Sequence, residues 1–478
     1  MASAVAWVIA MPCVAAAVCF VIGQRWLLAV VIPAVAATVV MAGLVAAEVA
    51  RVGAFDHELG GWMAPLGIRL HADGLSAFMV CIQAGVGTLV SVYALGFLAA
   101  KARARAASYL WPLWLLLWGA LNGLYLTGDL FNAYVTLELV GVTAVALVAM
   151  AGGVALVAAV RYVLVTLFAS LVYVLGVALI YTQFGMIDME AVGVQAAAEP
   201  ATRVALVLMA VGLLLKTAVF PLHFWLPPAH ANALGPVSAI LSALVIKGSF
   251  YLLVRLWNSV FPGATTASLA EALGVLGVLA VFWGGLQALR QQRLKMIVAY
   301  STVAQVGYLL LAFPLGGMAW LGALYFAAAH ACGKGAMFLA AATIKDAVGD
   351  DSLEHLEGVA GRLPITVFSF ALGSIVLIGL PPTGGFIGKW LILSAAIEAE
   401  RWLYILVIPI GTLLSAGYVF RFVGPALREL KSPGAPIQVP VTMEISALAL
   451  ALAGVALGFA ASPLLSFLAI GAPFGAGG

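Results

Sequence analysis

The chain has 478 residues, of which 65% are hydrophobic and only 9% are charged, and its formal net charge is +3. Ordinary soluble domains carry about 25% charged residues, so this composition excludes a soluble particle and predicts an all-α polytopic membrane protein. The basic residues are scattered over loops and form no run long enough to follow a nucleic-acid backbone, so we expect no nucleic-acid partner. The four cysteines show no metal-ligand or CxxC spacing, so we expect neither a metal site nor a disulfide.

Apolar runs of at least about 18 residues predict about fourteen membrane-spanning helices. We place them near residues 5–22, 27–48, 74–98, 109–126, 130–150, 156–182, 203–222, 236–260, 269–289, 295–313, 318–343, 363–398, 402–424 and 443–470. The first run lacks a basic segment before it and is expected to be a retained helix. The run at 363–398 is too long for one straight crossing, so PPTGG at 381–385 is expected to break it.

We treat residues 1–478 as one transmembrane domain. It is expected to comprise N-terminal helices 1–3 in 1–108, a first repeat in 109–260, a second repeat in 269–424 and a last helix in 443–470. Each repeat would hold five helices, and because five is odd the second copy must be inverted in the membrane.

Basic residues gather in the short loops on one side of the predicted helices, among them Arg290, Arg293 and Lys295. This bias predicts that side as cytoplasmic and both termini as extracytoplasmic, in a cell (inner) membrane protein. Residues 51–72 are the only sizeable non-helical segment before the third helix and are expected to form a small hairpin or interfacial cap. Asp56 and His57 in this segment are expected to be solvated loop residues.

Residues 213–236, LLLKTAVFPLHFWLPPAHANALGP, place Lys216 inside an apolar run, five residues before Pro221. A charge beside a helix-breaking proline is stable at membrane depth only against other protein or a wet cavity. Lys216 is therefore the first functional candidate. The alternative is a lysine near a helix end that reaches the headgroups.

Few ionisable residues stand inside apolar runs: Glu138, Arg161, Lys216, Lys247, His330, Lys334 and Lys389. Glu138 is the only acid deep in a span, and its expected partner is Lys216 or Arg161. The alternative is a permanent ion pair that ties two helices together. His330 and Lys334 are four residues apart on one helical face, although an apolar helix also accommodates a histidine as a core residue.

Lys389 follows the second predicted break, as Lys216 precedes the first. Paired interruptions in two halves indicate an inverted repeat with a transport site at its interface. Burial disfavours the charged form of a lysine and a nearby carboxylate favours it. If Glu138 and Lys216 separate, the lysine can pass its proton inward. We therefore hypothesise a proton relay through Lys247, His330, Lys334 and Lys389, in which protonation of one group shifts the next.

Five passages carry a resemblance to a known family: TGDLFNAYVTLEL, LLLKTAVFPLHFWLPPAHANALGPVSAILSALVIKG, RLKMIVAYSTVAQVGYLLL, HACGKGAMFL and GLPPTGGFIGKW. The chain resembles the proton-pumping, antiporter-like membrane subunits shared by respiratory complex I, membrane-bound hydrogenases and Mrp-type multisubunit Na⁺/H⁺ antiporters. TGDLFN and the lysine in GFIGK are most similar to the Mrp D subunit.

The resemblance implies a fold of fourteen helices with two inverted five-helix repeats and broken seventh and twelfth helices. It also implies roles for six residues. Protons would enter at Glu138 and Lys216, pass Lys247 as the central relay and His330 and Lys334 as its continuation, and reach Lys389 as the exit-side group.

Three functions remain open on the sequence. The first is the proton-translocating subunit of a Mrp-type cation/proton antiporter, and the second is the pump subunit of a redox complex. The third is a solitary transporter of an organic substrate. Because the chain has no nucleotide-binding glycine motif and no cysteine cluster, we expect no cofactor and no enzymatic redox step in it. The expected partners are other membrane subunits, H⁺, Na⁺ through the complex, and the lipid bilayer.

Overall fold

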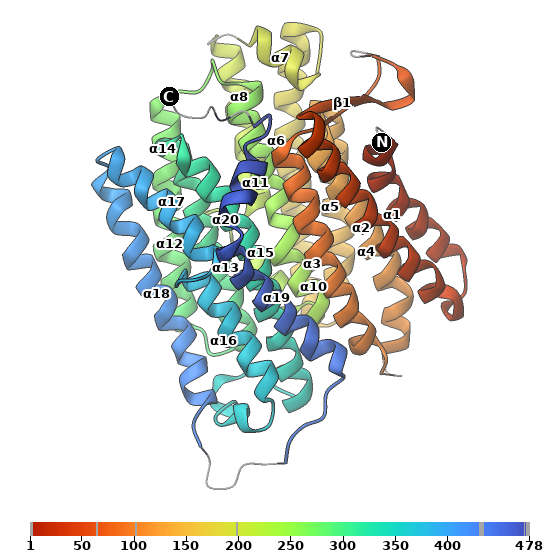
Figure 1. Ribbon diagram of the computed structural model, residues 1–478, viewed down its shortest axis with the longest axis vertical. Coiled ribbons are helices and arrows are strands. Elements are labelled where there is room, and N and C mark those ends of the chain that lie inside the picture. Colours follow the sequence, from red (N-terminus) through yellow and green to blue (C-terminus); the bar gives the residue numbers. More distant parts are fainter. Residues whose placement is uncertain are drawn as a thin grey trace.

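The structure is a computed structural model that describes residues 3–63, 66–100, 103–196, 199–429, 435–472 and 474. It is a bundle of long, roughly aligned helices with one small hairpin (Figure 1). The helices of the first half are α1 (Ser3–Val21), α2 (Leu27–Val52), α3 (Gly74–Leu98), α4 (Ala104–Leu126), α5 (Leu130–Ala149), α6 (Val154–Phe184), α7 (Met189–Gln195), α8 (Pro200–Thr217), α9 (Leu226–Asn232), α10 (Gly235–Ile240) and α11 (Ile246–Arg255).

The second half of the chain is also helical. Its helices are α12 (Ala267–Arg290), α13 (Leu294–Leu310), α14 (Ala312–Leu315), α15 (Met318–Val348), α16 (Pro364–Ile378), α17 (Gly384–Glu398), α18 (Trp402–Ala426), α19 (Val441–Phe459) and α20 (Ala461–Leu468). Within the described residues, eleven helices are long and apolar enough to cross a membrane. The all-α polytopic class is confirmed, whereas the count of fourteen spans and the inversion of the repeats stay predictions.

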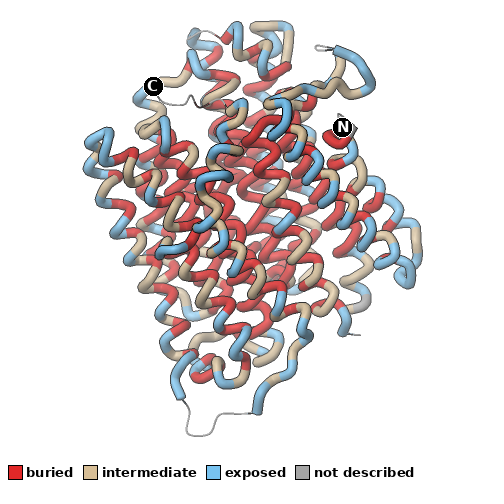
Figure 2. Tube along the Cα trace, viewed as in Figure 1, coloured by how far each residue is buried: buried red, intermediate tan, exposed pale blue. Residues whose placement is uncertain are grey.

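The centre of the bundle is formed by α15 and by the helix that runs from α10 through the π-helical segment η4 (Leu241–Val245) into α11. The most apolar window of the helix over residues 235–260 is completely buried within the chain. Figure 2 shows this buried core surrounded by helices with an exposed outer face. In lipid such outer faces need no polar cover. Ionisable side chains at membrane depth are therefore expected to face the interior of the bundle.

Both predicted helix breaks are confirmed. Helix α8 ends at Thr217, where Ala218 adopts a left-handed conformation with φ 57°, and the chain turns before α9 begins. Helix α16 ends at Ile378, where Gly379 has φ 84°, and Thr383 caps the start of α17 by accepting a hydrogen bond from the Phe386 amide. Each break leaves backbone carbonyls at the end of a helix without their usual intrahelical donors.

The segment between α2 and α3 forms the predicted hairpin. Strands β1 (Phe55–Glu58) and β2 (Arg69–Ala72) pair antiparallel, with Asp56 opposite His71. Helix α1 contacts this hairpin, and the Gly74 amide donates a 2.7 Å hydrogen bond to the Ile470 carbonyl. Both ends of the described chain therefore lie near the hairpin, and we call this side of the bundle the hairpin end.

The predicted last helix at 443–470 is wrong in one respect, because two helices occupy this stretch. Helix α19 ends at Phe459, and the short helix α20 follows after Ala460. Pro463 lies in the first turn of α20, where its missing backbone N–H is tolerated, but the same ring would clash inside a continuous helix.

Candidate functional site

The first helix break brings Lys216 to Glu138. Lys216 lies in the last turn of α8, and its Nζ is 3.4 Å from Glu138 Oε1 on α5. The same amine donates to Thr166 Oγ1 on α6 at 2.7 Å and to the Leu137 carbonyl at 3.4 Å. The lysine side chain is 8% exposed and that of the glutamate 22%. The ion pair is thus long, and neutral oxygens share the amine.

A small cavity of about 20 Å³ adjoins Lys216 and reaches Ser249 on α11. This is room for about one water molecule. Thr217 Oγ1 lies 2.8 Å from Ser249 Oγ, which extends the polar contact from α8 to α11. Helix α11 also carries Lys247, two residues before Ser249. Polar groups therefore continue from the Glu138–Lys216 pair towards the centre of the bundle.

Lys247 and His330 form the central contact, since Lys247 Nζ is 2.6 Å from His330 Nδ1. Lys247 Nζ also donates to the Ser242 carbonyl in the π-helical segment η4. Such π-helical turns are frequent at functional sites. At this separation one nitrogen must donate and the other accept, so lysine and imidazole share a proton.

Lys334 lies one turn after His330 on α15 and is fully buried. Its Nζ donates to the Val298 carbonyl on α13 at 2.9 Å and to Ser301 Oγ. The prediction that His330 and Lys334 face one interior is confirmed by these contacts. Neutral oxygens surround Lys334.

Lys389 lies beside the second break. Its Nζ donates to the carbonyls of Leu377 and Ile378, the last two residues of α16, at 2.9 and 3.1 Å. The amine also lies 4.3 Å from the ring centre of Tyr308 and 5.3 Å from that of Phe326. The negative end of the α16 dipole and two aromatic faces thus stabilise this cation.

Phe326 connects Lys389 with the centre. It precedes His330 by one turn of α15, and the two ring centres are 6.1 Å apart. The structure therefore forms two contacts, Glu138 with Lys216 and Lys247 with His330. Lys334 follows one turn after His330, and the Phe326 ring lies between His330 and Lys389. We call the set of Glu138, Lys216, Lys247, His330, Lys334 and Lys389 the buried axis.

The alternative prediction that Arg161 is the partner of Glu138 is wrong. It lies on the exposed face of α6, two turns from the start of that helix, whereas Lys216 contacts the glutamate. An arginine near a helix end can extend its long side chain towards the membrane surface. Lys295 is a second correction. The prediction counts it with the basic loop residues although it begins the predicted helix at 295–313, and in the structure it is buried near the start of α13, where its Nζ donates to the Ala233 carbonyl at 2.7 Å.

Sequence reasoning also missed His230 in α9. This residue is completely buried, and within the described part of the chain neither ring nitrogen has a hydrogen-bond partner. It lies within electrostatic reach of Lys247, Lys334 and Lys295. The available signal was its position in LPPAHAN, directly after the first break.

Asp56 departs from its predicted role as a merely solvated loop residue. It is exposed, but its carboxylate contacts Arg69 at 3.1 Å and His71 at 2.7 Å. These contacts belong to a second polar cluster at the hairpin end.

Comparison with known proteins identifies the family. The sequence profile of the transmembrane region of NADH:quinone oxidoreductase and Mrp antiporter subunits matches residues 127–415. The chain belongs to this family. It is 35% identical over 391 residues to the N subunit of the NADH-quinone oxidoreductase of Desulforudis audaxviator, covering 80% of this chain and 78% of that protein. It is 29% identical over 421 residues to the D subunit of the Na⁺/H⁺ antiporter of Alkalihalophilus pseudofirmus, covering 86% and 84%.

The fold is shared with solved members of multisubunit membrane complexes. A chain of the archaeal membrane-bound sulfane sulfur reductase superimposes with a TM-score of 0.91 at 28% identity, covering 98% of this chain and 96% of that one. The resemblance expected from the five sequence passages is therefore confirmed, and the buried axis lies in the region that the family profile spans, residues 127–415.

Proposed function

We propose that the chain is the proton-translocating subunit of a multisubunit cation (Na⁺)/proton antiporter, with protons relayed along the buried axis. The observation that carries the proposal is the Glu138–Lys216 pair at a helix break, followed by Lys247 in contact with His330. The similarity to the D subunit of an antiporter over most of both chains supports the same function.

At the first break, Lys216 can be in two environments, with Glu138 beside it or with Glu138 moved away. Lys216 has one charged partner and two neutral ones, so movement of Glu138 leaves the amine among the Thr166 hydroxyl and the Leu137 carbonyl. Neutral oxygens stabilise an ammonium less than a carboxylate does, and the lysine then releases its proton more readily. The adjacent cavity, which extends to Ser249, is the route towards Lys247.

Electrostatic repulsion between protonated Lys247 and protonated His330 moves the proton onward. Lys247 and His330 cannot both be fully protonated at 2.6 Å, so a proton that arrives at one displaces the proton of the other. Lys334 and Lys389 are the next buried amines. In the inverted-repeat arrangement that we propose, with both termini extracytoplasmic, Lys389 is the group on the exit side.

A membrane potential is large enough to act on this element. Moving one charge through 100 mV involves about 2.3 kcal/mol, comparable to separating one modest ion pair. The potential therefore biases the separation of Glu138 and Lys216. Because amines dominate the buried axis and Na⁺ requires several oxygen ligands, we assign the Na⁺ path to partner subunits.

The test is Lys216→Ala in the intact complex, measured by sodium-22 uptake driven by a proton gradient. We expect uptake to be lost while the complex still assembles, because no other amine contacts Glu138 among the described residues. Arg203→Ala is the matched control, since it removes an exposed cation from the same helix. Unchanged uptake by the Lys216 variant would remove the proposal.

A second function is favoured by the similarity to the N subunit of an NADH-quinone oxidoreductase. In this alternative the same buried axis is the proton pump of a redox complex, and partner subunits supply the electron transfer. The composition of the purified complex separates the two functions. Flavin or iron–sulfur absorbance in the complex supports the redox alternative, and a set of colourless membrane subunits supports the antiporter.

A further inference from the structure

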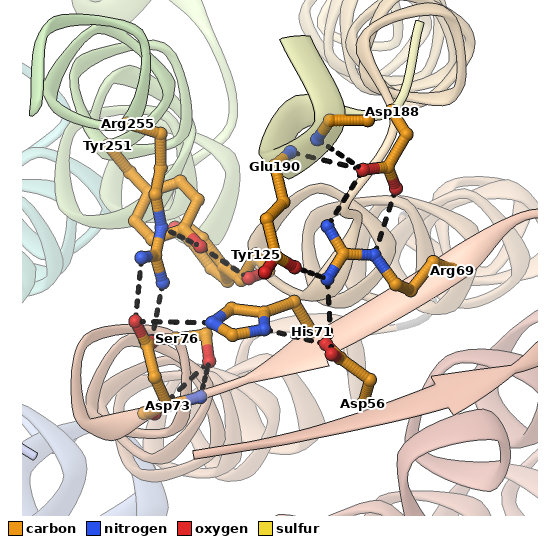
Figure 3. Close-up of polar contacts among 11 residues, drawn as sticks. Asp56, Arg69, His71, Asp73, Ser76, Tyr125, Asp188, Glu190, Tyr251 and Arg255 are labelled. Atoms are coloured by element: carbon orange, nitrogen blue, oxygen red, sulfur yellow. Dashed lines mark hydrogen bonds and ion pairs between the residues drawn. The ribbon is translucent and has the colours of Figure 1, made fainter. Parts of the chain in front are cut away.

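A second polar cluster lies at the hairpin end, at the far end of α11 from Lys247. Figure 3 shows the polar contacts among its residues. We call it the hairpin cluster, and its members are Asp56, Arg69, His71, Asp73, Asp188, Glu190, Tyr251 and Arg255. They come from both strands of the hairpin, from the residues that cap α3 and α7, and from α7 and α11. None of them belongs to the buried axis.

One half of the hairpin cluster runs from the hairpin to α11. His71 Nδ1 is 2.7 Å from Asp56 Oδ1, and His71 Nε2 is 3.7 Å from Asp73 Oδ2. Arg255 donates to both oxygens of Asp73, with Nη1 at 2.6 Å from Oδ2. Arg255 Nε also donates to the Tyr251 hydroxyl at 2.9 Å. His71 is therefore linked through Asp73 and Arg255 to Tyr251.

The other half joins the hairpin to α7. Arg69 donates to both oxygens of Asp188, at 2.8 and 3.0 Å, and also contacts Asp56 and Glu190. With His71 protonated, the hairpin cluster contains one more acid than cations. It consequently attracts positive ions and protons more than anions.

Burial increases steadily across the cluster. The side chains of Glu190 and Asp56 are 70% and 42% exposed, that of His71 is 31% exposed, and Asp73 is fully buried. A cavity of about 270 Å³ adjoins the cluster and is lined by His71, Glu190, Tyr251, Arg255 and Ser259 among others. This volume has room for several water molecules. The cavity thus extends from the exposed side chain of Glu190 to the buried end of α11.

Helix α11 contributes to both this cavity and the small one beside Lys216. Ser249 lines the small cavity and Tyr251 lines the large one, and side chains two residues apart on a helix point to different faces, so the two cavities meet α11 from different sides. Leu124 on α4 lines the small cavity, and the neighbouring Tyr125 accepts a 2.5 Å hydrogen bond from the Tyr251 hydroxyl at its carbonyl.

We propose that the large cavity is a port through which Lys216 exchanges protons with water at the hairpin end. His71 takes up and releases the proton at the mouth of the port, and Tyr251 forms the wall towards Lys216. The exchange at His71 breaks one N–H bond and forms one O–H bond on a cavity water, which leaves a neutral imidazole. The inference rests on the proposed function, because a port requires a proton path behind it.

The electrostatic environment of His71 supports this role. Burial opposes the charged imidazole, but the contacts with Asp56 and Asp73 outweigh burial and Arg255, and raise the pKa of His71 to about 9. Of the remaining charged groups of the cluster, Arg69 lies on β2 two residues before His71, and Asp188 and Glu190 contact Arg69 from the start of α7. The imidazole is therefore protonated below about pH 9 and loses its proton as the pH rises through that value.

The first test is His71→Gln in the intact complex, with transport measured while the pH on the hairpin side is varied. The wild-type rate should fall as this pH rises through about 9, and the variant should lose that dependence. His57→Gln is the matched control, because His57 pairs with Leu70 and points to the opposite face of the hairpin. A variant of lower thermal stability with an unchanged pH profile would overturn the proposal in favour of a purely structural cluster.

The second test is Ser259→Cys in a background without the native cysteines, treated with a cationic, membrane-impermeant thiol reagent. Modification places a positive charge in the cavity and should abolish most of the transport. Ser268→Cys, which is exposed at the start of α12, is the control whose modification should leave the rate unchanged. A fully modified Ser259→Cys complex that transports at the unmodified rate would overturn the port.

Lys216→Ala separates this inference from the proposed function. If that variant still transports, the proposed function fails and the port fails with it. If it loses transport while His71→Gln keeps the wild-type pH profile and modified Ser259→Cys keeps its rate, only the port is wrong.

Discussion

Both broken helices place a buried lysine beside the break, but the two lysines are stabilised by different partners. Each break has a residue with positive φ, Ala218 or Gly379, a cis X–Pro bond, and a buried lysine. Lys216 contacts a carboxylate, whereas the hydrogen bonds of Lys389 go to two helix-end carbonyls and its remaining contacts are aromatic rings.

The partner of Lys216 is a side chain that can move, whereas the partners of Lys389 are backbone groups that are fixed. A carboxylate on a side chain can move away from Lys216, but the carbonyls of Leu377 and Ile378 are part of the backbone. Hydrogen bonds from a charged group contribute about 1.5–3 kcal/mol each, so Lys389 is held firmly without any acid. The first break is therefore suited to switching, and the second to a stable end position.

The largest expected effect comes from removing the movable partner. Glu138→Gln keeps the shape of the side chain but leaves Lys216 with neutral oxygens only, as at the second break. We expect transport to be lost while assembly of the complex is retained, measured by ion uptake and by size-exclusion chromatography. Glu271→Gln is the control, since it changes a carboxylate that contacts Arg401 and the Tyr404 hydroxyl and no residue of the buried axis. Full transport by the Glu138 variant would contradict a switching role for the pair.

A smaller effect is expected when the fixed partner is removed. Lys389→Met leaves the Leu377 and Ile378 carbonyls without this donor, at a cost of about 1–3 kcal/mol for each unpaired group. We expect a lower thermal unfolding midpoint together with reduced transport. Lys389→Arg retains a charged donor and should restore the midpoint better than transport. An unchanged midpoint in the methionine variant would show that Lys389 does not hold the second break.

The turn residues sharpen the comparison. At Gly379 an added Cβ would lie 2.9 Å from Lys389 Cδ, and φ is 84°. Gly379→Ala is therefore expected to destabilise the protein by about 1–2 kcal/mol through left-handed strain and to displace the lysine. Ala218→Gly at the first break needs no such adjustment and should change the midpoint little. Equal effects of the two substitutions, measured by thermal unfolding, would contradict the distinction.

The smallest effect concerns the cap of the first break. Trp225 Nε1 donates a 3.0 Å hydrogen bond to the Leu215 carbonyl, which is one of the groups that the break exposes. Trp225→Phe removes this donor and should lower stability by about 1 kcal/mol, with transport retained. Loss of transport at normal stability would instead assign Trp225 to the relay.

The sequence was sufficient to predict features that depend on a single segment of the chain. Charged residues in apolar runs and prolines or glycines within them are visible locally, so both breaks and the lysines beside them could be predicted. The burial of Lys295 was missed because this residue follows Arg290 and Arg293 closely at the start of its helix, where a lysine usually reaches the membrane surface. The hairpin cluster escaped because its members are ordinary loop charges until folding joins them, as with Arg69 and Asp188, 119 residues apart.

Asp73 has a consequence for the biogenesis of the protein. Its carboxylate caps the first turn of α3 through the Ser76 amide, and it also binds Arg255, which is synthesised 182 residues later. Helix α3 thus acquires its local cap early in translation, but this acid gains its counter-ion only when α11 has been inserted. A chain that ends before Arg255 therefore leaves the Asp73 carboxylate without this cation, so the start of α3 reaches its final electrostatic environment only after α11 has been made.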